Sequence, residues 1–304
     1  MKIFGNIELV DLAVYTNRTL IVSDFHIGYE EALNKQGILM PRFQFKEVIE
    51  RLGNIFRKLK GRKIDKIVIL GDLKHEFGTI SEQEWRHTLR LLDYLGQRCK
   101  EIILIKGNHD TILGPIAQKR NVKVQDYYVV EPIKNDKQMP IIMKTNSKNK
   151  SKIANITSKA LKKLKVTKKA GKKIKNHNKI LCLHGDKMPS KELLEGISTI
   201  IIGHEHPAVS IKDGPRAELF KCFLVGKWKG KNLIVVPAFN LVTEGTDILR
   251  NCYAISGTQK IPKEFSSVMK EKLLSPFLKS NLRNFKVIVV EDRLYWFGKI
   301  GDLS

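Results

Sequence analysis

The chain has 304 residues, enough for one large α/β domain or two smaller ones, and 42% hydrophobic with 28% charged residues is typical of a globular protein. Lys and Arg number 55 against 31 Asp and Glu, a formal charge of +24. This excess favours a polyanionic partner, nucleic acid before an acidic membrane surface. A basic proteome or a salt-rich cytosol is the competing explanation.

Several classes of protein are excluded. No stretch approaches the ~18 consecutive apolar residues of a membrane span, and residues 1–5 lack the apolar run of a signal peptide. The cysteines are too widely spaced for a zinc knuckle or a redox pair, and their apolar neighbours predict buried thiols in a reducing compartment; they are Cys99, Cys182, Cys222 and Cys252. We therefore expect a soluble, cytoplasmic protein with no membrane partner.

The first part of the chain predicts strands that alternate with helices. Apolar runs at 19–22, 66–70 and 101–105 are predicted as strands. Apolar residues at helical spacing predict a helix from after Pro41 to about Lys60, and Ser81 with Glu84 forms a capping box that opens a second helix. Strands separated by helices are typical of a parallel sheet with functional residues at the carboxyl ends of its strands.

The composition changes between Lys134 and Lys179. This segment contains sixteen lysines and one acidic residue, and so supplies +15 of the +24 charge. Its first part predicts a flexible basic loop, and 151–164 a weakly amphipathic basic helix. We interpret 134–179 as an insertion that binds DNA or RNA; a solvated insertion without a ligand is the alternative.

The rest of the chain is rich in predicted strands. They lie at 179–183, 199–202, 209–211, 220–225, 232–237 and 252–255, with a short helix at 191–195 and a C-terminal hairpin of 285–290 and 294–297. We expect one domain over 1–304, with residues 256–304 as an extension that caps the site or makes a dimer contact. The oligomeric state is left open.

Five predicted strands end in residues that bind metals. Neutral imidazole and carboxylate oxygens are metal ligands, and five of the eight histidines lie at these ends, which uniform scatter would not produce. His204 and His206 alone are equally compatible with a polar turn. The full set is Asp24 with His26, Asp72, Asn108 with His109, His184, and His204 with His206.

The ordered motifs DxH, GD, GNHD, HGD and GHEH resemble the calcineurin-like metallophosphoesterase superfamily, which includes nucleases and purple acid phosphatases. The resemblance covers about residues 1–255 without the basic insertion. Residues 71–77 and 203–208 are similar to the archaeal and bacterial ICC-like phosphoesterases, including the branch associated with DNA ligases. The resemblance implies a four-layer α/β/β/α sandwich of two mixed sheets flanked by helices.

The resemblance also implies two divalent metal ions. One is held by Asp24, His26, Asp72 and His206, the other by Asp72, Asn108, His184 and His204, with Asp72 as the bridge. Two ions ~3.5–4 Å apart neutralise a phosphodiester and activate a water for in-line attack. Mn is the preferred metal; Fe, Zn, Ni and Co stay open because these ligands admit all of them.

Four further residues are candidates near the phosphate. By resemblance His109 contacts the scissile phosphate and protonates the leaving oxygen as general acid, and Asp110 orients it. His75 and Arg42 are candidate substrate contacts, each with a structural role as the alternative. Because His204 and His206 are two apart in a segment expected to be extended, their side chains should share a direction while Glu205 points away.

The function predicted is hydrolysis of phosphodiester bonds in nucleic acid by a dinuclear metal-dependent enzyme. A small-molecule phosphatase or cyclic-nucleotide phosphodiesterase is one alternative, in which the basic insertion is incidental. A non-catalytic nucleic-acid-binding module on the same scaffold is the other, disfavoured because every expected ligand is present.

Overall fold

The computed structural model describes residues 1–78, 80–111, 113–133, 179–213, 215–250, 273–279 and 282–303. By internal contacts the chain forms two units, Met1–Pro132 with His177–Ser304, and Ile133–Asn176. All elements described below belong to the first unit. The Lys-rich segment except Lys179, the strand predicted at 252–255 and much of the predicted extension lie outside the described residues, and the single-domain organisation stays a prediction.

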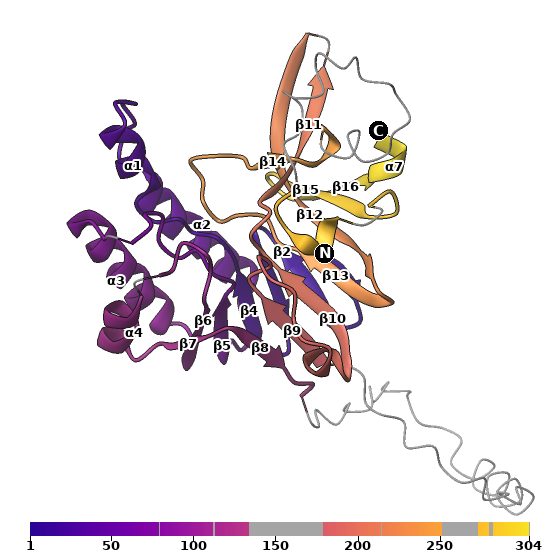
Figure 1. The fold of residues 1–304 in the computed structure, drawn as a ribbon, viewed down its shortest axis with the longest axis horizontal. Coiled ribbons are helices and arrows are strands. Elements are labelled where there is room, and N and C mark those ends of the chain that lie inside the picture. Colours follow the sequence, from indigo (N-terminus) through magenta and orange to yellow (C-terminus); the bar gives the residue numbers. More distant parts are fainter. Residues whose placement is uncertain are drawn as a thin grey trace, which may run out of the picture. The chain divides into compact units, whose positions relative to one another are not determined.

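The first sheet has seven strands in sequence order (Figure 1). Its N-terminal strands pair antiparallel; they are β1 (Lys2–Phe4), β2 (Ile7–Val10), β3 (Ala13–Thr16) and β4 (Thr19–Val22). From β4 onward the pairing is parallel, through β5 (Lys66–Ile69), β6 (Glu101–Ile105) and β7 (Lys123–Gln125). The strands predicted at 19–22, 66–70 and 101–105 are therefore confirmed, whereas β1, β2, β3 and β7 were not predicted, because none of them has three consecutive Ile, Leu or Val residues.

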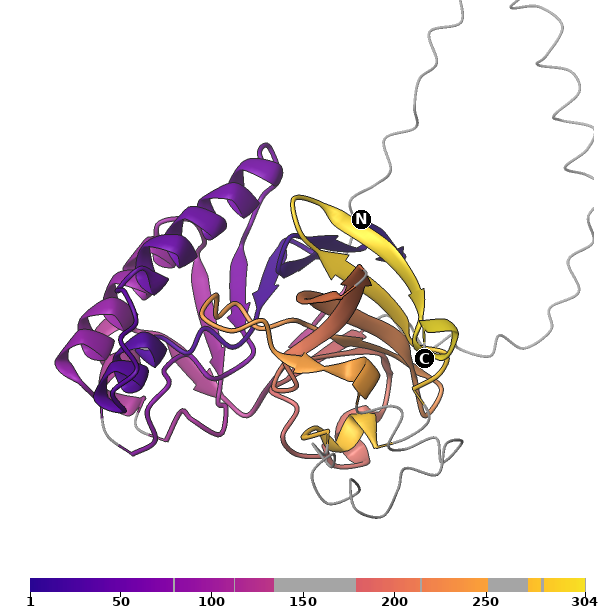
Figure 2. The same ribbon diagram turned by 90° about the horizontal axis from the view of Figure 1, so that it is seen from above.

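Helices cover the outer face of this sheet, as the indigo and purple layer of Figure 2 shows. They are α1 (Tyr29–Lys35), α2 (Gln44–Lys58), α3 (Glu82–Gly96) and α4 (Gly114–Arg120). Helix α2 buries Val48, Leu52 and Ile55, which lie on one face because they are spaced four and three apart. Helix α3 begins at the predicted capping box, where the Glu84 N–H donates to Ser81 Oγ at 3.1 Å.

The second sheet has nine strands and is also mixed. The path β14-β11-β12-β13-β10-β9-β8 is extended by β15, which pairs with β12, and by β16, which pairs with β15. The parallel centre is β9 (Lys179–Leu183), β10 (Ile197–Ile202) and β13 (Lys231–Val235). The other strands are β8 (Tyr127–Val130), β11 (Pro207–Asp213), β12 (Arg216–Trp228), β14 (Thr246–Asp247), β15 (Lys286–Val290) and β16 (Leu294–Lys299). The predicted C-terminal hairpin is confirmed as β15–β16.

Alternation along the strands of the second sheet builds two cores. Along β10, Ile201 joins the large core that contains the first sheet, whereas Ile200 and Ile202 join a separate core on the opposite face. That face is covered by short helices: η2 (Pro276–Leu278) and α7 (Ile300–Leu303) add Phe277, Leu278 and Ile300 to it. A third short helix is η1 (Glu192–Leu194). The predicted fold of two mixed sheets flanked by helices is thus confirmed.

Backbone hydrogen bonds join the two sheets where the central strands end. The Phe239 N–H donates to Ser23 O at 2.8 Å and the Asn240 N–H to Asp24 O at 2.9 Å, so the segment after β13 lies along the loop after β4. Within the second sheet, the Gly203 N–H donates to His184 O at 2.8 Å. The polar residues that follow β4, β5, β6, β9 and β10 therefore meet at one edge of the sandwich.

Candidate metal centre

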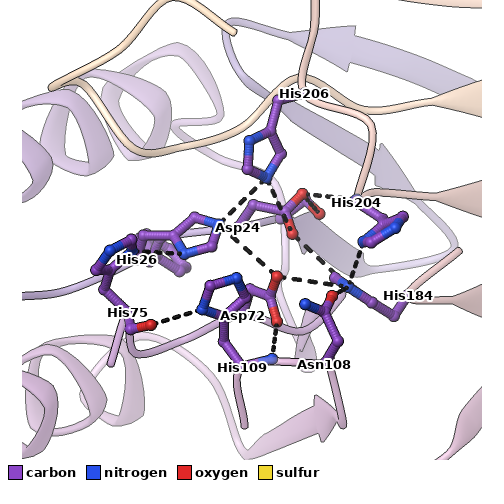
Figure 3. Close-up of polar contacts among 12 residues, drawn as sticks. Asp24, His26, Asp72, His75, Asn108, His109, His184, His204 and His206 are labelled. Carbon is purple, nitrogen blue, oxygen red and sulfur yellow. Dashed lines mark hydrogen bonds and ion pairs between the residues drawn. The ribbon is translucent and has the colours of Figure 1, made fainter. Parts of the chain in front are cut away.

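The predicted ligand side chains converge in the structure. Figure 3 shows Asp72 near the middle, with Asp24, His26 and His206 on one side and Asn108, His184 and His204 on the other. Three groups of potential ligands have ligand atoms within 4.8 Å of one another; one of them consists of His26, His75 and His109, and the other two contain only predicted ligands. We call Asp24, His26 and His206 group one, and Asp72, His184 and His204 group two.

The backbone at five of these ligands is left-handed. Positive φ angles of 44–66° occur at Asp24, His26, Asp72, His204 and His206. Side chains with a Cβ rarely adopt this conformation, which costs of the order of 1–3 kcal/mol and persists where the surroundings impose it. The expected extended segment at His204–His206 is therefore wrong. The chain turns at both histidines, and this turn carries His204 to group two and His206 to group one.

Glycines allow the loops to approach this closely. A Cβ at Gly107 would collide with Asp72 Oδ1, and one at Gly203 would collide with Ser23 Oγ. Both glycines immediately precede a predicted ligand, Asn108 and His204. The loops therefore pack too closely at these two positions for any residue other than Gly before Asn108 and His204.

Group one brings two imidazoles onto a buried carboxylate. His26 Nε2 lies 3.2 Å from His206 Nε2, and His206 Nε2 lies 3.7 Å from Asp24 Oδ1. His26 Nε2 is also 3.7 Å from Asp72 Oδ2, which links this group to the next. Asp24 Oδ2 accepts from Ser23 Oγ at 2.5 Å and from the His204 N–H at 3.0 Å, so the carboxylate orientation is set by the loops themselves.

Group two converges on His184. Its Nε2 lies 2.9 Å from Asn108 Oδ1, 3.0 Å from His204 Nδ1 and 3.5 Å from Asp72 Oδ2. Its Nδ1 lies 2.7 Å from Leu70 O. A carbonyl only accepts, so Nδ1 carries the proton and Nε2 presents its lone pair to the site.

This donor set fits bound cations. In group two the lone pair of His184 Nε2, the amide oxygen of Asn108 and a carboxylate oxygen of Asp72 point at one another, with His204 beside them. A cation between these atoms stabilises the arrangement, whereas hydrogen bonding does not satisfy it. In group one Asp24 Oδ1 is fully buried without a hydrogen-bond partner. Ligands at right angles around an ion, each at about 2.1 Å, lie ~3.0 Å apart, close to the 2.9–3.2 Å separations between the imidazole and amide atoms here.

The charges of the two groups act on each other. Burial raises the pKa of Asp24, but His206, His184 and His26 outweigh it, and the net pKa is below its usual range. Burial lowers the pKa of His184, yet Asp24 and Asp72 bring it above the ordinary value. Burial, followed by the charge of His206, holds the pKa of His26 well below 6.5. His26 is therefore neutral at pH 7, which is the form that ligates metals.

His109 lies beside group one. Its backbone N–H donates to Asp72 Oδ1 at 2.9 Å, and its Nδ1 lies 2.5 Å from His75 O. The ring centroids of His109 and His26 are 4.8 Å apart. His75 Nδ1 lies 3.4 Å from His26 Nδ1. His75 and His109, both predicted to lie near the phosphate, are thus at the site. His109 Nδ1 faces the carbonyl of His75.

Asp110 has partners other than the His109 ring. Its Oδ1 accepts from the Leu73 N–H at 3.0 Å and its Oδ2 from the Gly107 N–H at 3.1 Å. These two bonds tie the loop after β5 to the loop after β6. The geometry therefore favours a role for Asp110 in holding the two loops together over the predicted orientation of His109.

Three other residues lie away from the ligands. Arg42 is exposed, and its charge acts on Glu30 and His87. His87 stacks on Phe45 with ring centroids 4.5 Å apart. Glu205 points away from the site as expected; it is fully buried and accepts the Ser275 N–H at 2.8 Å. Among the described contacts, none brings Arg42 to the site.

The sequence did not predict two residues that hold the first ligand loop. Gln44, the first residue of α2, is 3% exposed. Its Nε2 donates to His26 O at 2.9 Å and to Asn240 Oδ1 at 3.1 Å, and its Oε1 accepts the Gly28 N–H at 3.3 Å. A Gln after a helix-initiating Pro carries no signal of this kind, and Asn240 lies 196 residues further along the chain.

A cavity of about 470 Å³ adjoins group two. His184 forms part of its wall, together with Lys106, Tyr127, Lys187 and Met188. Asp126 and Asp186 also line it and balance the two lysines, with Lys187 Nζ 3.7 Å from Asp186 Oδ2, while Tyr127 and Met188 add apolar surface.

Comparisons with known proteins agree with this fold. The family model of the calcineurin-like phosphoesterases matches residues 17–220, more than half of the chain. Nuclease MPE from Pseudomonas putida has a similar structure, with 16% identity, 98% of each chain covered and a TM-score of 0.52. A Vps29 mutant from Entamoeba histolytica gives 13% identity over 90% of this chain and 86% of that one, with a TM-score of 0.28. No curated protein matches the chain.

The chain therefore belongs to the calcineurin-like phosphoesterase family. The resemblance stated from the motifs is confirmed, and membership supports a hydrolase of phosphoesters that uses divalent metals. The likeness to nuclease MPE, at this identity, shows the fold alone, and the Vps29 likeness adds no argument. Within the described residues, no helix combines the length and the hydrophobicity needed to cross a bilayer.

Proposed function

We propose that this protein is a dinuclear metal-dependent phosphodiesterase that acts on nucleic acid. The observation that carries the proposal is the convergence of two ligand groups on Asp72, with Asp24 Oδ1 buried beside them without a hydrogen-bond partner. Asp24, His26, Asp72 and His206 would hold one divalent ion, and Asp72, Asn108, His184 and His204 the other. When bound, such ions neutralise phosphate charge and lower the pKa of a coordinated water.

The remaining side chains have separate tasks. With its Nδ1–H donating a hydrogen bond to the His75 carbonyl, the His109 ring is held in one orientation. As an imidazolium it would carry a second proton on Nε2, which it would transfer to the leaving oxygen and so become neutral. Asp110 holds the loops that carry Asp72 and Asn108 at a constant separation. Mn²⁺ is the first metal to test, because Asp, Asn and His ligands admit it.

Replacing His109 tests the general-acid role. In His109→Ala we expect both ions to remain, while cleavage of a diester with a nucleoside leaving group falls by about 10²–10⁴. A p-nitrophenyl ester should lose much less, because p-nitrophenolate leaves as a stable anion without needing a proton. Initial rates on both substrates with Mn²⁺ measure the difference, and a chelator should abolish both activities. Equal losses on the two substrates, or a loss of metal, would contradict the assignment.

The proposal that the substrate is nucleic acid rests on the net charge of the chain and on its structural similarity to a nuclease. The net charge of +24 favours a polyanion, and a protein of similar fold is a nuclease. Deleting 134–179 should weaken binding of a short single strand and reduce the dependence of affinity on salt. Fluorescence anisotropy at several salt concentrations, compared with hydrolysis of a small diester as the control, makes the test. Unchanged affinity would favour a small phosphoester as substrate. Cytoplasmic location remains a prediction, and the oligomeric state stays open.

A further inference from the structure

Phe77 is an exposed aromatic side chain next to His109. It lies in the loop after β5, and 59% of its surface is exposed. Its ring centroid lies 3.8 Å from that of His109, at an interplanar angle of 33°. Phe77 therefore covers one face of the proposed general acid and presents apolar surface to solvent.

The rings form a continuous series. The centroids of His109 and His75 lie 5.4 Å apart at 27°, and those of His75 and Tyr29 lie 4.3 Å apart at 50°. The His75 carbonyl also fixes the His109 ring through Nδ1. Phe77 thus lies at the outer end of a supported series of rings and does not depend on substrate for its position.

We propose that Phe77 is a stacking platform for an unpaired nucleobase on the leaving-group side of the scissile phosphodiester. This rests on the proposed function, because His109 marks the side from which the leaving oxygen departs. The nucleoside that carries this oxygen is bonded directly to it, so its base lies within reach of the ring that packs on His109.

The platform requires an unpaired base. Within a duplex both faces of a base are covered by its neighbours, whereas a single strand or an extrahelical nucleotide presents a free face to an aromatic side chain. Every base has such a face, so stacking discriminates between strand states with little sequence preference. The structure therefore points to single-stranded or locally unpaired nucleic acid as the substrate class.

The test compares substrates with and without that base. Thymidylyl-thymidine and its two abasic analogues, each lacking one base, are hydrolysed with Mn²⁺, and the products show which nucleoside leaves. In the wild type, removing the base on the leaving side should lower kcat/KM by about 5–100-fold. Phe77→Ala should abolish this discrimination, and Phe77→Trp should retain it.

Phe43 provides a matched control. It is the same side chain, 58% exposed, and has no ring contact with a site histidine among the described residues. Phe43→Ala should leave the discrimination intact. The platform is overturned if Phe77→Ala still discriminates as the wild type does, or if Phe43→Ala acts equally. If the wild type hydrolyses none of the three substrates, the proposed function itself fails; if it hydrolyses them without any Phe77 effect, only the platform fails.

Discussion

The two ligand groups share Asp72 but differ in their surroundings. In group two, His184 follows β9, the carbonyl of Leu70 after β5 fixes its ring at 2.7 Å, and a cavity of about 470 Å³ adjoins it. Group one is surrounded by the rings of His75 and His109. Its loop is held by backbone bonds, with the His26 N–H donating to Asp72 O at 2.9 Å, and also by the side chain of Gln44. Both groups are thus held by backbone contacts, and group one has in addition a side-chain contact from helix α2.

This difference separates binding roles within one site. Around group two the cavity presents Tyr127 together with two lysines and two aspartates, and so offers an aromatic surface and paired charges beside the ligands. Around group one the histidines suit proton transfer at the reacting oxygen. The effects should therefore decrease from variants of the shared Asp72, through variants of one histidine in either group, to a variant of Gln44.

The largest effect is expected for Asp72→Asn. The carboxylate lies between the groups, 3.7 Å from His26 Nε2 and 3.5 Å from His184 Nε2. Without its charge the paired ions should not both be retained, and loss of several kcal/mol of transition-state stabilisation corresponds to about 10³-fold lower activity. Elemental analysis and diester hydrolysis measure the outcome. Asp93→Asn, an exposed carboxylate paired with Arg120, is the control; two retained ions would contradict the bridging role.

The positions of these side chains could be predicted from the sequence because each follows an apolar strand. Parallel strands place their carboxyl ends at one edge, so Asp24, Asp72 and Asn108 had to lie near one another. Conversely, apolar periodicity does not report loop conformation. The left-handed backbone at His204 and His206 was missed because non-glycine residues avoid it unless tertiary contacts impose it.

The supporting contacts were predictable only where they are local. The bond between Ser81 and Glu84 follows from a three-residue spacing. The same Glu84 also accepts the N–H groups of His75 and Glu76 at 2.8 and 3.0 Å, and this could not be predicted because it depends on how α3 packs beside the loop after β5. Gln44 and Asn240 are a stronger case, since their contact joins helix α2 to the segment after β13.

Replacing a single histidine, either His206 in group one or His204 in group two, should have the next largest effect. His206→Ala should weaken the group-one ion by at least about 100-fold and leave the other ion bound, while His204→Ala should do the reverse. A bound Mn²⁺ pair gives a spin-coupled EPR spectrum, and each variant should give the spectrum of an isolated ion. His87→Ala, on α3, is the control.

A double-variant cycle assigns each remaining ion to its group. Asn108 lies beside His184, so Asn108→Ala should add little to His204→Ala, because both affect the same ion. Added to His206→Ala, it should weaken the only remaining ion. If the two combinations behaved alike, the ions would not be divided between the groups as proposed.

The smallest effect is expected for Gln44→Glu, which keeps the shape of the side chain but removes its N–H donors. The carbonyl of His26 and Asn240 Oδ1 would then each lose a hydrogen bond and face a carboxylate oxygen instead. Because residues that orient ligands influence metal affinity about 10–100-fold, group one should bind its ion about 10-fold more weakly. Group two, which has no contact with the Gln44 side chain among the described hydrogen bonds, should be unchanged.

Calorimetric Mn²⁺ titration of Gln44→Glu in two backgrounds isolates the groups. With His204→Ala only the group-one ion remains, and the substitution should weaken it; with His206→Ala only the group-two ion remains, and affinity should not change. Gln97→Glu, an exposed residue after α3, controls for the added charge. If Gln44 had only a structural role, Gln44→Glu would lower the free energy of unfolding in both backgrounds and would weaken the binding of both ions alike. Weaker binding of the group-one ion alone therefore identifies Gln44 as the residue that positions His26.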